Sequence, residues 1–167
     1  LGRCISKFVP AENLVVPYET SDLDTCENIT QVVRMSLNDL KKKQLGGQYR
    51  DIEVLPAQGS IDEVRKEIDY VDGVEPSNYD YDCTVLEVHA NLDLEGYEDV
   101  DEEGEPTGIK VPYIVTISED NGQILSIRRN YAEDDELKKK VQYFVHYKFL
   151  PGFGFYGLGL IHTIGGL

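Results

Sequence analysis

The chain has 167 residues and a mass of 18.9 kDa, which suits one domain or two very small ones. Its 16 basic and 31 acidic side chains give a formal net charge of −15, which argues against sequence-independent nucleic-acid binding because phosphate contacts need Lys and Arg. No run of about 18 apolar residues predicts a membrane span, and no signal-peptide pattern opens the chain.

The first forty-five residues predict one strand and one helix after an irregular start. Residues 8–18 are apolar but broken by prolines, which is typical of an edge strand or an extended connector. Residues 29–35 are rich in β-branched side chains and predict a strand. Ser36 then has the position of an N-cap for a helix over 37–45, and Gly46-Gly47 supplies the stop.

A second helix is predicted over residues 61–71, with Ser60 as its cap. Its apolar residues recur at offsets of three, four and three, which places them on one stripe that we expect to pack on a sheet. These residues are Ile61, Val64, Ile68 and Val71.

The pattern then changes to the period of a strand. Residues 83–90 alternate, and the apolar face is predicted to carry Thr84, Leu86, Val88 and Ala90. Residues 111–118 and 123–131 predict a hairpin, and Asn121-Gly122 between them suits a two-residue type I′ turn.

The last part of this region adds one helical turn and one more alternating run. Residues 133–140 are acidic first and basic last, as a short helix prefers. Residues 141–150 place alternate apolar side chains on one face: Val141, Tyr143, Val145, Tyr147 and Phe149. We therefore predict an α+β fold, with a mostly antiparallel sheet of about four strands and two or three helices.

Cysteine and histidine give no metal or disulfide pattern. The three cysteines contain no C-x-x-C pair, and their odd number and wide spacing favour reduced thiols in a cytosolic setting. The three histidines are equally scattered, so we expect no metal site and no cofactor. These residues are Cys4, Cys26, Cys83, His89, His146 and His162.

The acidic stretch 93–105 holds eight acidic side chains and no basic one. Asp99, Asp101 and Gly104 fit the first half of a calcium loop, but the twelfth position is Lys110 where a bidentate Glu is needed. A solvated hairpin tip is the favoured interpretation, and a calcium-dependent binding module is the alternative function.

The run Gly152-Phe-Gly-Phe-Tyr-Gly157 matches the spacing of a dinucleotide fingerprint. Pro151, the bulky aromatic residues and the ten residues that follow argue against that function, because a βαβ unit needs more chain. We interpret the run as an aromatic turn whose glycines let the backbone bend. With no recognisable catalytic motif elsewhere, we predict that the chain is not an enzyme, although a nucleotide-dependent enzyme or a hydrolase stays an alternative.

Charge and hydropathy set the C-terminal end apart. All 31 acidic side chains precede residue 137, whereas 137–167 hold four lysines and no acid. Apolar residues after Gly157 have helical spacing but too few turns for a stable isolated helix. Exposed apolar surface usually marks an interface. We therefore predict a subunit interface on Phe153, Phe155, Tyr156, Leu160, Ile161 and Ile164.

The same end carries a resemblance to a known family. The run 143–167, YFVHYKFLPGFGFYGLGLIHTIGGL, resembles the portal proteins of tailed double-stranded DNA bacteriophages and prophages. Shorter stretches support it, namely VPAENLVVPY at 9–18, VRMS at 33–36, GIKVPY at 108–113 and IRRN at 127–130.

The resemblance implies a structural subunit of a homo-oligomeric ring, typically of twelve copies, at one vertex of the capsid. Such a ring is the conduit for DNA packaging and ejection, docks terminase and head-completion proteins, and lets DNA pass without specific binding. It implies a wing-like domain over 1–150 and the start of a stem-like helix over 151–167. It places the protein in the virion, and in the host cytoplasm during assembly, with no membrane. Since the chain begins at Leu1 and lacks the remaining regions, we expect a processed or excised fragment.

Overall fold

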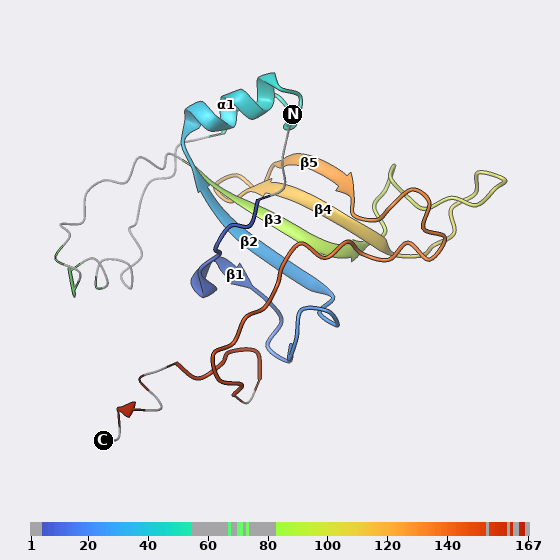
Figure 1. The fold of residues 1–167 in the computed structure, drawn as a ribbon. Helices are drawn as coiled ribbons and strands as arrows, with labels where there is room; N and C mark the ends of the chain where they lie inside the picture. Colours follow the sequence, from blue (N-terminus) through green and yellow to red (C-terminus); the bar gives the residue numbers. More distant parts are fainter. Residues whose placement is uncertain are drawn as a thin grey trace. The chain divides into compact units, whose positions relative to one another are not determined.

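The fold is given by a computed structural model that describes residues 5–54, 67, 70–71, 73, 83–152, 154–159, 161 and 164–165. The described chain forms one antiparallel sheet with the strand order β1-β2-β3-β4-β5, so sequential strands are neighbours (Figure 1). The strands are β1 (Leu14–Val15), β2 (Asn28–Met35), β3 (Cys83–Leu92), β4 (Val111–Ser118) and β5 (Ile124–Arg129). A 3-10 turn, η1 (Ala11–Asn13), precedes β1, and one α-helix, α1 (Leu37–Leu45), follows β2.

The α+β class is confirmed, but the counts differ from the prediction. The sheet has five strands because the short edge segment joins it, with Leu14 opposite Gln31 and Val15 opposite Thr30. Helix α1 is the one complete α-helix among the described residues, and helical backbone also occurs at Glu67, Tyr70, Val71, Ile161 and Ile164. Most of the helix predicted over 61–71 lies outside the described residues. Val71, which was expected to pack on the sheet, is 79% exposed.

Helix α1 has the predicted bounds because both of its ends are specified locally. Ser36 Oγ accepts the Asp39 N–H at 3.1 Å, which satisfies one of the free amides of the first turn. At the other end Gly47 has a φ of +70°, a left-handed conformation that glycine adopts at little cost. Its N–H donates to the Gln44 C=O and the Gln48 N–H to the Lys43 C=O, which together form a Schellman cap.

The described residues fall into two compact units, each with its own apolar core. The first includes residues within Leu1–Gln31, Val88–Ile114 and Arg128–Leu167, and the second residues within Val32–Glu87 and Val115–Ile127. Strands β2 to β5 therefore each contribute to both units. The predicted domain boundary at residue 150 does not coincide with a boundary between these units, and it stays a prediction.

In the second unit, α1 packs its buried face on sheet residues. Leu40 is the buried residue of the helix, and Leu37 packs at the edge of the same cluster. The cluster consists of Met35, Leu40, Val54, Cys83, Val85 and Leu125. Burial of each large aliphatic side chain here stabilises the fold by about 1.5–3 kcal/mol.

The first unit has a smaller core, in which residues distant in sequence meet. Leu23, Cys26 and Ile29 are buried together with Phe155, and Phe144 packs against them. The C-terminal part of the chain is thereby attached to the segment that leads into β2.

Strand β3 is buried more deeply on the face opposite the predicted apolar one, although Ala90 of the predicted face is also buried, at 7% exposure. Cys83 and Val85 are each 1% exposed, while Leu86 and Val88 are only half-buried. His89, which belongs to the set opposite the predicted apolar face, is also buried, at 7% exposure. Its ring packs against aromatic side chains from a segment that lies more than fifty residues later.

The hairpin between β4 and β5 is confirmed, but its turn is not type I′. The Ser118 N–H donates to the Gln123 C=O and the Gly122 N–H to the Ser118 C=O, so the loop spans residues 119–122. A type I′ turn needs a positive φ at both central residues, and only Gly122 has one. Asn121 uses its side chain instead, because its Oδ1 accepts the Gln123 N–H at 3.0 Å.

Candidate interaction surface

Asn130, directly after β5, fixes the start of the C-terminal segment. Its backbone N–H donates to the Pro112 C=O at 2.8 Å, which continues the contact between β5 and β4. Its C=O accepts the Val141 N–H at 2.9 Å, and its Nδ2 donates to the Val141 C=O at 3.3 Å. Residues 131–140 therefore form a loop that is closed by these hydrogen bonds, and Val141 lies again at the end of β5.

The helical turn predicted over 133–140 is wrong. Asp135 Oδ1 accepts the Leu137 N–H at 3.1 Å and its Oδ2 accepts the Lys139 N–H at 2.8 Å. An aspartate that bonds the amides after it favours a turn over a helix. Lys138 also has a φ of +48°, outside the right-handed helical region.

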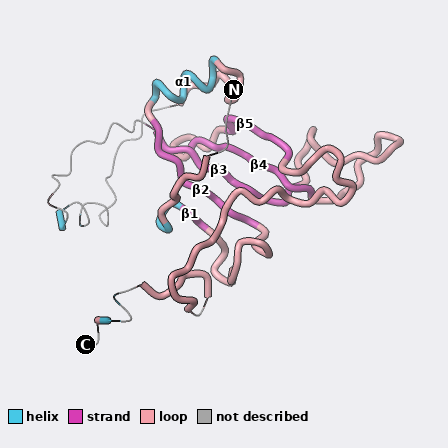
Figure 2. Tube along the Cα trace, viewed as in Figure 1, coloured by secondary structure: helices cyan, strands magenta, loops and turns pink. Residues whose placement is uncertain are grey.

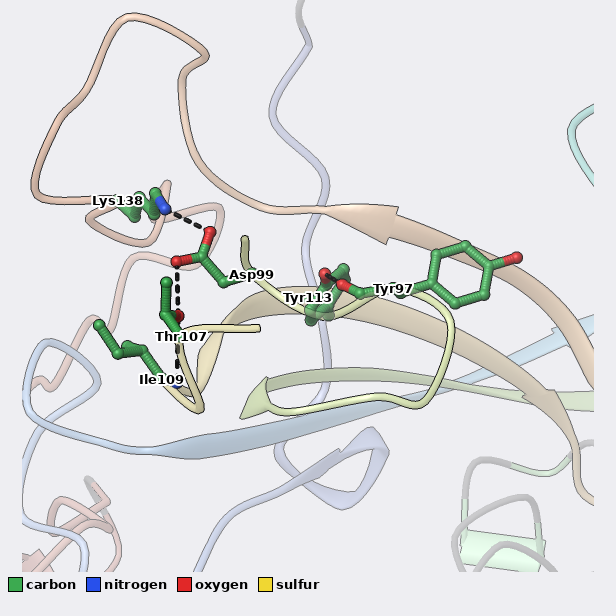
Figure 3. Close-up of polar contacts among 6 residues, drawn as sticks. All are labelled: Tyr97, Asp99, Thr107, Ile109, Tyr113 and Lys138. Atoms are coloured by element: carbon green, nitrogen blue, oxygen red, sulfur yellow. Dashed lines mark hydrogen bonds and ion pairs between the residues drawn. The ribbon is translucent and has the colours of Figure 1, made fainter. Parts of the chain in front are cut away.

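The loop 131–140 is attached to the acidic stretch 93–105 by a partly buried ion pair. Figure 3 shows Asp99 between two partners, with Lys138 Nζ donating to one carboxylate oxygen and Thr107 Oγ1 to the other. The Ile109 N–H donates in turn to Thr107 Oγ1 at 3.3 Å. The hydrogen bond from Lys138 lowers the pKa of the Asp99 carboxyl below its ordinary value, and the Thr107 bond lowers it further.

Strand β4 holds the base of the acidic loop. The hydroxyl of Tyr113, a side chain that is 1% exposed, donates to the Tyr97 C=O (Figure 3). Val100 and Pro106 form an antiparallel bridge that narrows the loop. The predicted hairpin tip thus has an ordered base.

The carboxylates that suggested a calcium loop have partners within the protein. Asp99 is paired as described, and Asp101 Oδ1 accepts the N–H groups of Glu103 and Glu105, both at 2.9 Å. Within the described ranges, no three His, Cys, Asp or Glu side chains are grouped so that they could hold a metal ion. The carboxylates of Asp99 and Asp101 therefore stabilise the loop through hydrogen bonds and an ion pair within the protein.

Residues 142–148 belong to the first unit, and every second side chain of the segment contacts other parts of that unit. Gln142 Nε2 donates to the Leu23 C=O at 3.1 Å. Lys148 Nζ donates to the Ser21 C=O at 3.3 Å and to the Gly154 C=O at 3.1 Å. The polar members of the even-numbered set thus satisfy the carbonyls of Ser21 and Leu23, which lie far away in the sequence, and the nearby carbonyl of Gly154.

The aromatic members of the same set pack on the core. Phe144 lies edge-on to the His89 ring, with centroids 5.0 Å apart. His146 stacks on Phe155 at 4.2 Å. Burial lowers the pKa of the His146 imidazole, and the charge of Lys148 lowers it further.

The odd-numbered side chains from 141 to 149 are exposed and form what we call the apolar row, although the Tyr143 ring also lies edge-on to His89, with centroids 5.8 Å apart. Their exposures are 41%, 62%, 94%, 88% and 63% in chain order. The row consists of Val141, Tyr143, Val145, Tyr147 and Phe149. The predicted alternation is therefore present, but the segment is an extended connection and no strand of the sheet, as its loop colouring in Figure 2 shows.

The glycine-rich turn has the structural role that was predicted for it. Leu150 and Leu158 form an antiparallel bridge, with the Leu158 N–H donating to the Leu150 C=O at 2.9 Å. A Cβ on Gly157 would lie 2.7 Å from the Leu150 C=O oxygen, so the close approach requires glycine. Gly154 has a φ of +88°.

The predicted interface residues have different positions. Phe155 is 8% exposed and belongs to the core of its own unit, so its side chain is not presented to a partner. Tyr156, Ile161 and Ile164 are exposed at 60%, 77% and 54%. Phe153 and Leu160 lie outside the described residues. Sequence reasoning did not name the apolar row as an interface, although its alternation was the signal that could have identified it.

The first unit also contains a small pocket beside Asn130. It has a volume of about 10 Å³, whereas small-molecule sites occupy roughly 300–1,000 Å³. The Asn130 Oδ1 atom is buried without a hydrogen-bond partner among the described residues, and His89 and Lys140 also line the space. The Lys140 ammonium is directed to the Cys26 C=O at 2.6 Å. The pocket is the size of about one water molecule, so it offers no site for a nucleotide.

Comparisons with known proteins found no match among family models, curated proteins or solved structures. In the described part of the chain, no helix has the length and apolar character that crossing a membrane requires.

Proposed function

We propose that this chain is part of a structural subunit of the portal ring at the capsid vertex of a tailed double-stranded DNA phage or prophage. The observation that carries the proposal is the apolar row, which is exposed although it consists only of Val, Tyr and Phe. A contiguous exposed apolar surface indicates assembly. The resemblance of residues 143–167 to portal proteins gives that assembly its class.

The acidic character of the chain supports the same function. A ring of about twelve copies, each with a charge of −15, would surround its channel with a strongly negative field. Double-stranded DNA is a dense polyanion, and affinity for it depends on Lys and Arg contacts to phosphate. A conduit with few such contacts lets DNA slide through during packaging and ejection without holding it.

In this proposal residues 1–150 are the wing-like part and 151–167 begin the stem-like helix. Helical backbone at Ile161 and Ile164, with the Gly165 N–H donating to the Ile161 C=O at 2.8 Å, supports a helix in that position. The partners are other copies of the protein, terminase, the capsid and head-completion proteins. The protein acts without a cofactor and without enzymatic activity, in the virion and in the host cytoplasm during assembly.

The test is the assembly state of the whole protein that contains residues 1–167. Mass photometry and native mass spectrometry should find closed assemblies of about twelve subunits. Monomers alone, at every salt and protein concentration tried, would contradict the proposal. Antibodies against the protein should also label a single vertex of the virion, and even labelling of the shell would count against a portal.

A further inference from the structure

Residues 142–149 have the backbone of a strand that lacks a neighbour. Within the described ranges, none of their N–H or C=O groups forms a hydrogen bond with another backbone group. The flanking residues do, since the Val141 N–H bonds to Asn130 and the Leu150 C=O to Leu158. The segment is therefore held at both ends while its own backbone groups stay available.

Proteins keep exposed edges apart with charged side chains, on the edge or turned inward, with prolines or with bulges. Residues 142–149 hold no proline, and their one charged residue, Lys148, donates to the Ser21 and Gly154 carbonyls. The outward face of the segment therefore carries only the apolar row. Val, Tyr and Phe are also the residue types that favour strands. An extended segment with these features is suited to β-augmentation, in which it pairs with a strand of another chain.

Charge identifies a second copy as the occupant. Two copies that each carry −15 repel one another, and the repulsion is weakest where acidic side chains are absent. The segment lies in the part of the chain that has four lysines and no acid, whereas every acidic side chain lies in residues 1–136. A copy can therefore dock its acid-free segment on the acid-rich body of the next copy. Contacts between two different surfaces of one protein are head-to-tail, and such contacts form a closed ring when the rotation between copies closes and an open filament when it does not.

We infer that residues 142–149 pair as a β-strand with a neighbouring copy of this chain, with the apolar row covered by that copy. The inference rests on the proposed function for its assembly, but it assigns the contact to one segment and to backbone pairing.

Hydrogen exchange measured by mass spectrometry tests the inference on the whole protein, with monomer and assembly separated by size. The amides of 142–149 should exchange fast in the monomer and at least about tenfold more slowly in the assembly. The hairpin loop 119–122 serves as an internal control and should exchange alike in both. If a ring forms and 142–149 stay as fast as in the monomer, the inference fails and the proposed function survives. If the segment is already slow in the monomer, its backbone groups are paired within the chain and the inference is wrong. If no assembly forms, both fail.

Two variants at Val145, whose side chain is 94% exposed, separate pairing from side-chain contact. Val145→Pro removes the N–H and should weaken assembly by at least about tenfold, because proline interrupts a strand ladder. Val145→Thr keeps the backbone and the β-branched shape, and it should assemble within about twofold of the parent. The melting temperature of both monomers should match the parent. Normal assembly of the proline variant would overturn the inference.

Discussion

Replacement of Phe155 by alanine distinguishes a core residue from an interface residue. The side chain is 8% exposed among Leu23, Cys26 and Ile29, and it stacks on His146. Removal of a core phenylalanine costs about 3–5 kcal/mol of folding free energy. The cluster is small and lies near the surface, so we expect the lower end, about 3 kcal/mol, which corresponds to a fall in melting temperature of about 6–12 °C.

Urea unfolding followed by far-UV circular dichroism measures the loss, since the chain has no tryptophan. The midpoint should fall while the slope stays constant, because the surface exposed on unfolding is unchanged. Tyr156→Ala is the matched control, and it should cost under about 1 kcal/mol because Tyr156 is 60% exposed. If Phe155→Ala folds as stably as the parent but no longer assembles, the assignment of Phe155 to the core is refuted.

Three further predictions concern the anchors of the C-terminal segment. Since the His146 pKa is lowered in the folded state, stability should be complete above pH about 6.5 and fall as the pH drops from there towards the folded pKa; His146→Gln should abolish this component in thermal melts between pH 7 and 5, and an unchanged profile would contradict it. Gly157→Ala should destabilise the turn by about 1–3 kcal/mol because its Cβ would clash with the Leu150 C=O; equal melting temperatures of variant and parent would show that the approach is not tight. Lys138→Met should raise the pKa of Asp99, which NMR titration of its carboxyl carbon would measure. Because the lowered pKa of Asp99 contributes folding stability that is lost below pH about 4, the variant should lose less stability on acidification than the parent. An unshifted titration would rule out the ion pair.

Local signals explain why α1 and four of the strands could be predicted. Ser36 and Gly47 specify the two ends of α1 through hydrogen bonds to residues at most five positions away. Strands β2 to β5 follow runs of β-branched or alternating apolar residues, which is why their bounds lie within a few residues of the prediction.

The errors arose where distant residues decide the outcome. His89 is a polar residue by type, but Tyr143 and Phe144 enclose it, and neither is near it in sequence. Likewise, the alternation of apolar residues in 141–150 indicates only that successive side chains point to opposite sides, as they do in any extended segment. It does not indicate whether a neighbouring strand is present to pair with the backbone.

The candidate interface was only partly predictable for the same reason. Helical spacing after Gly157 suggested an apolar surface, and the exposure of Ile161 and Ile164 agrees with it. Phe155 was grouped with them because it is aromatic and lies in the same turn. Its place in the core depends on Leu23 and Ile29, whose proximity no local pattern specifies.

The central claim is that this chain assembles into a ring through its acid-free C-terminal segment. An electron cryomicroscopy reconstruction of the assembled whole protein tests it most directly. We expect a closed ring in which residues 142–149 lie within hydrogen-bonding distance of a strand of the adjacent subunit. A ring in which the apolar row faces solvent, or a preparation that contains only single subunits, would contradict the claim.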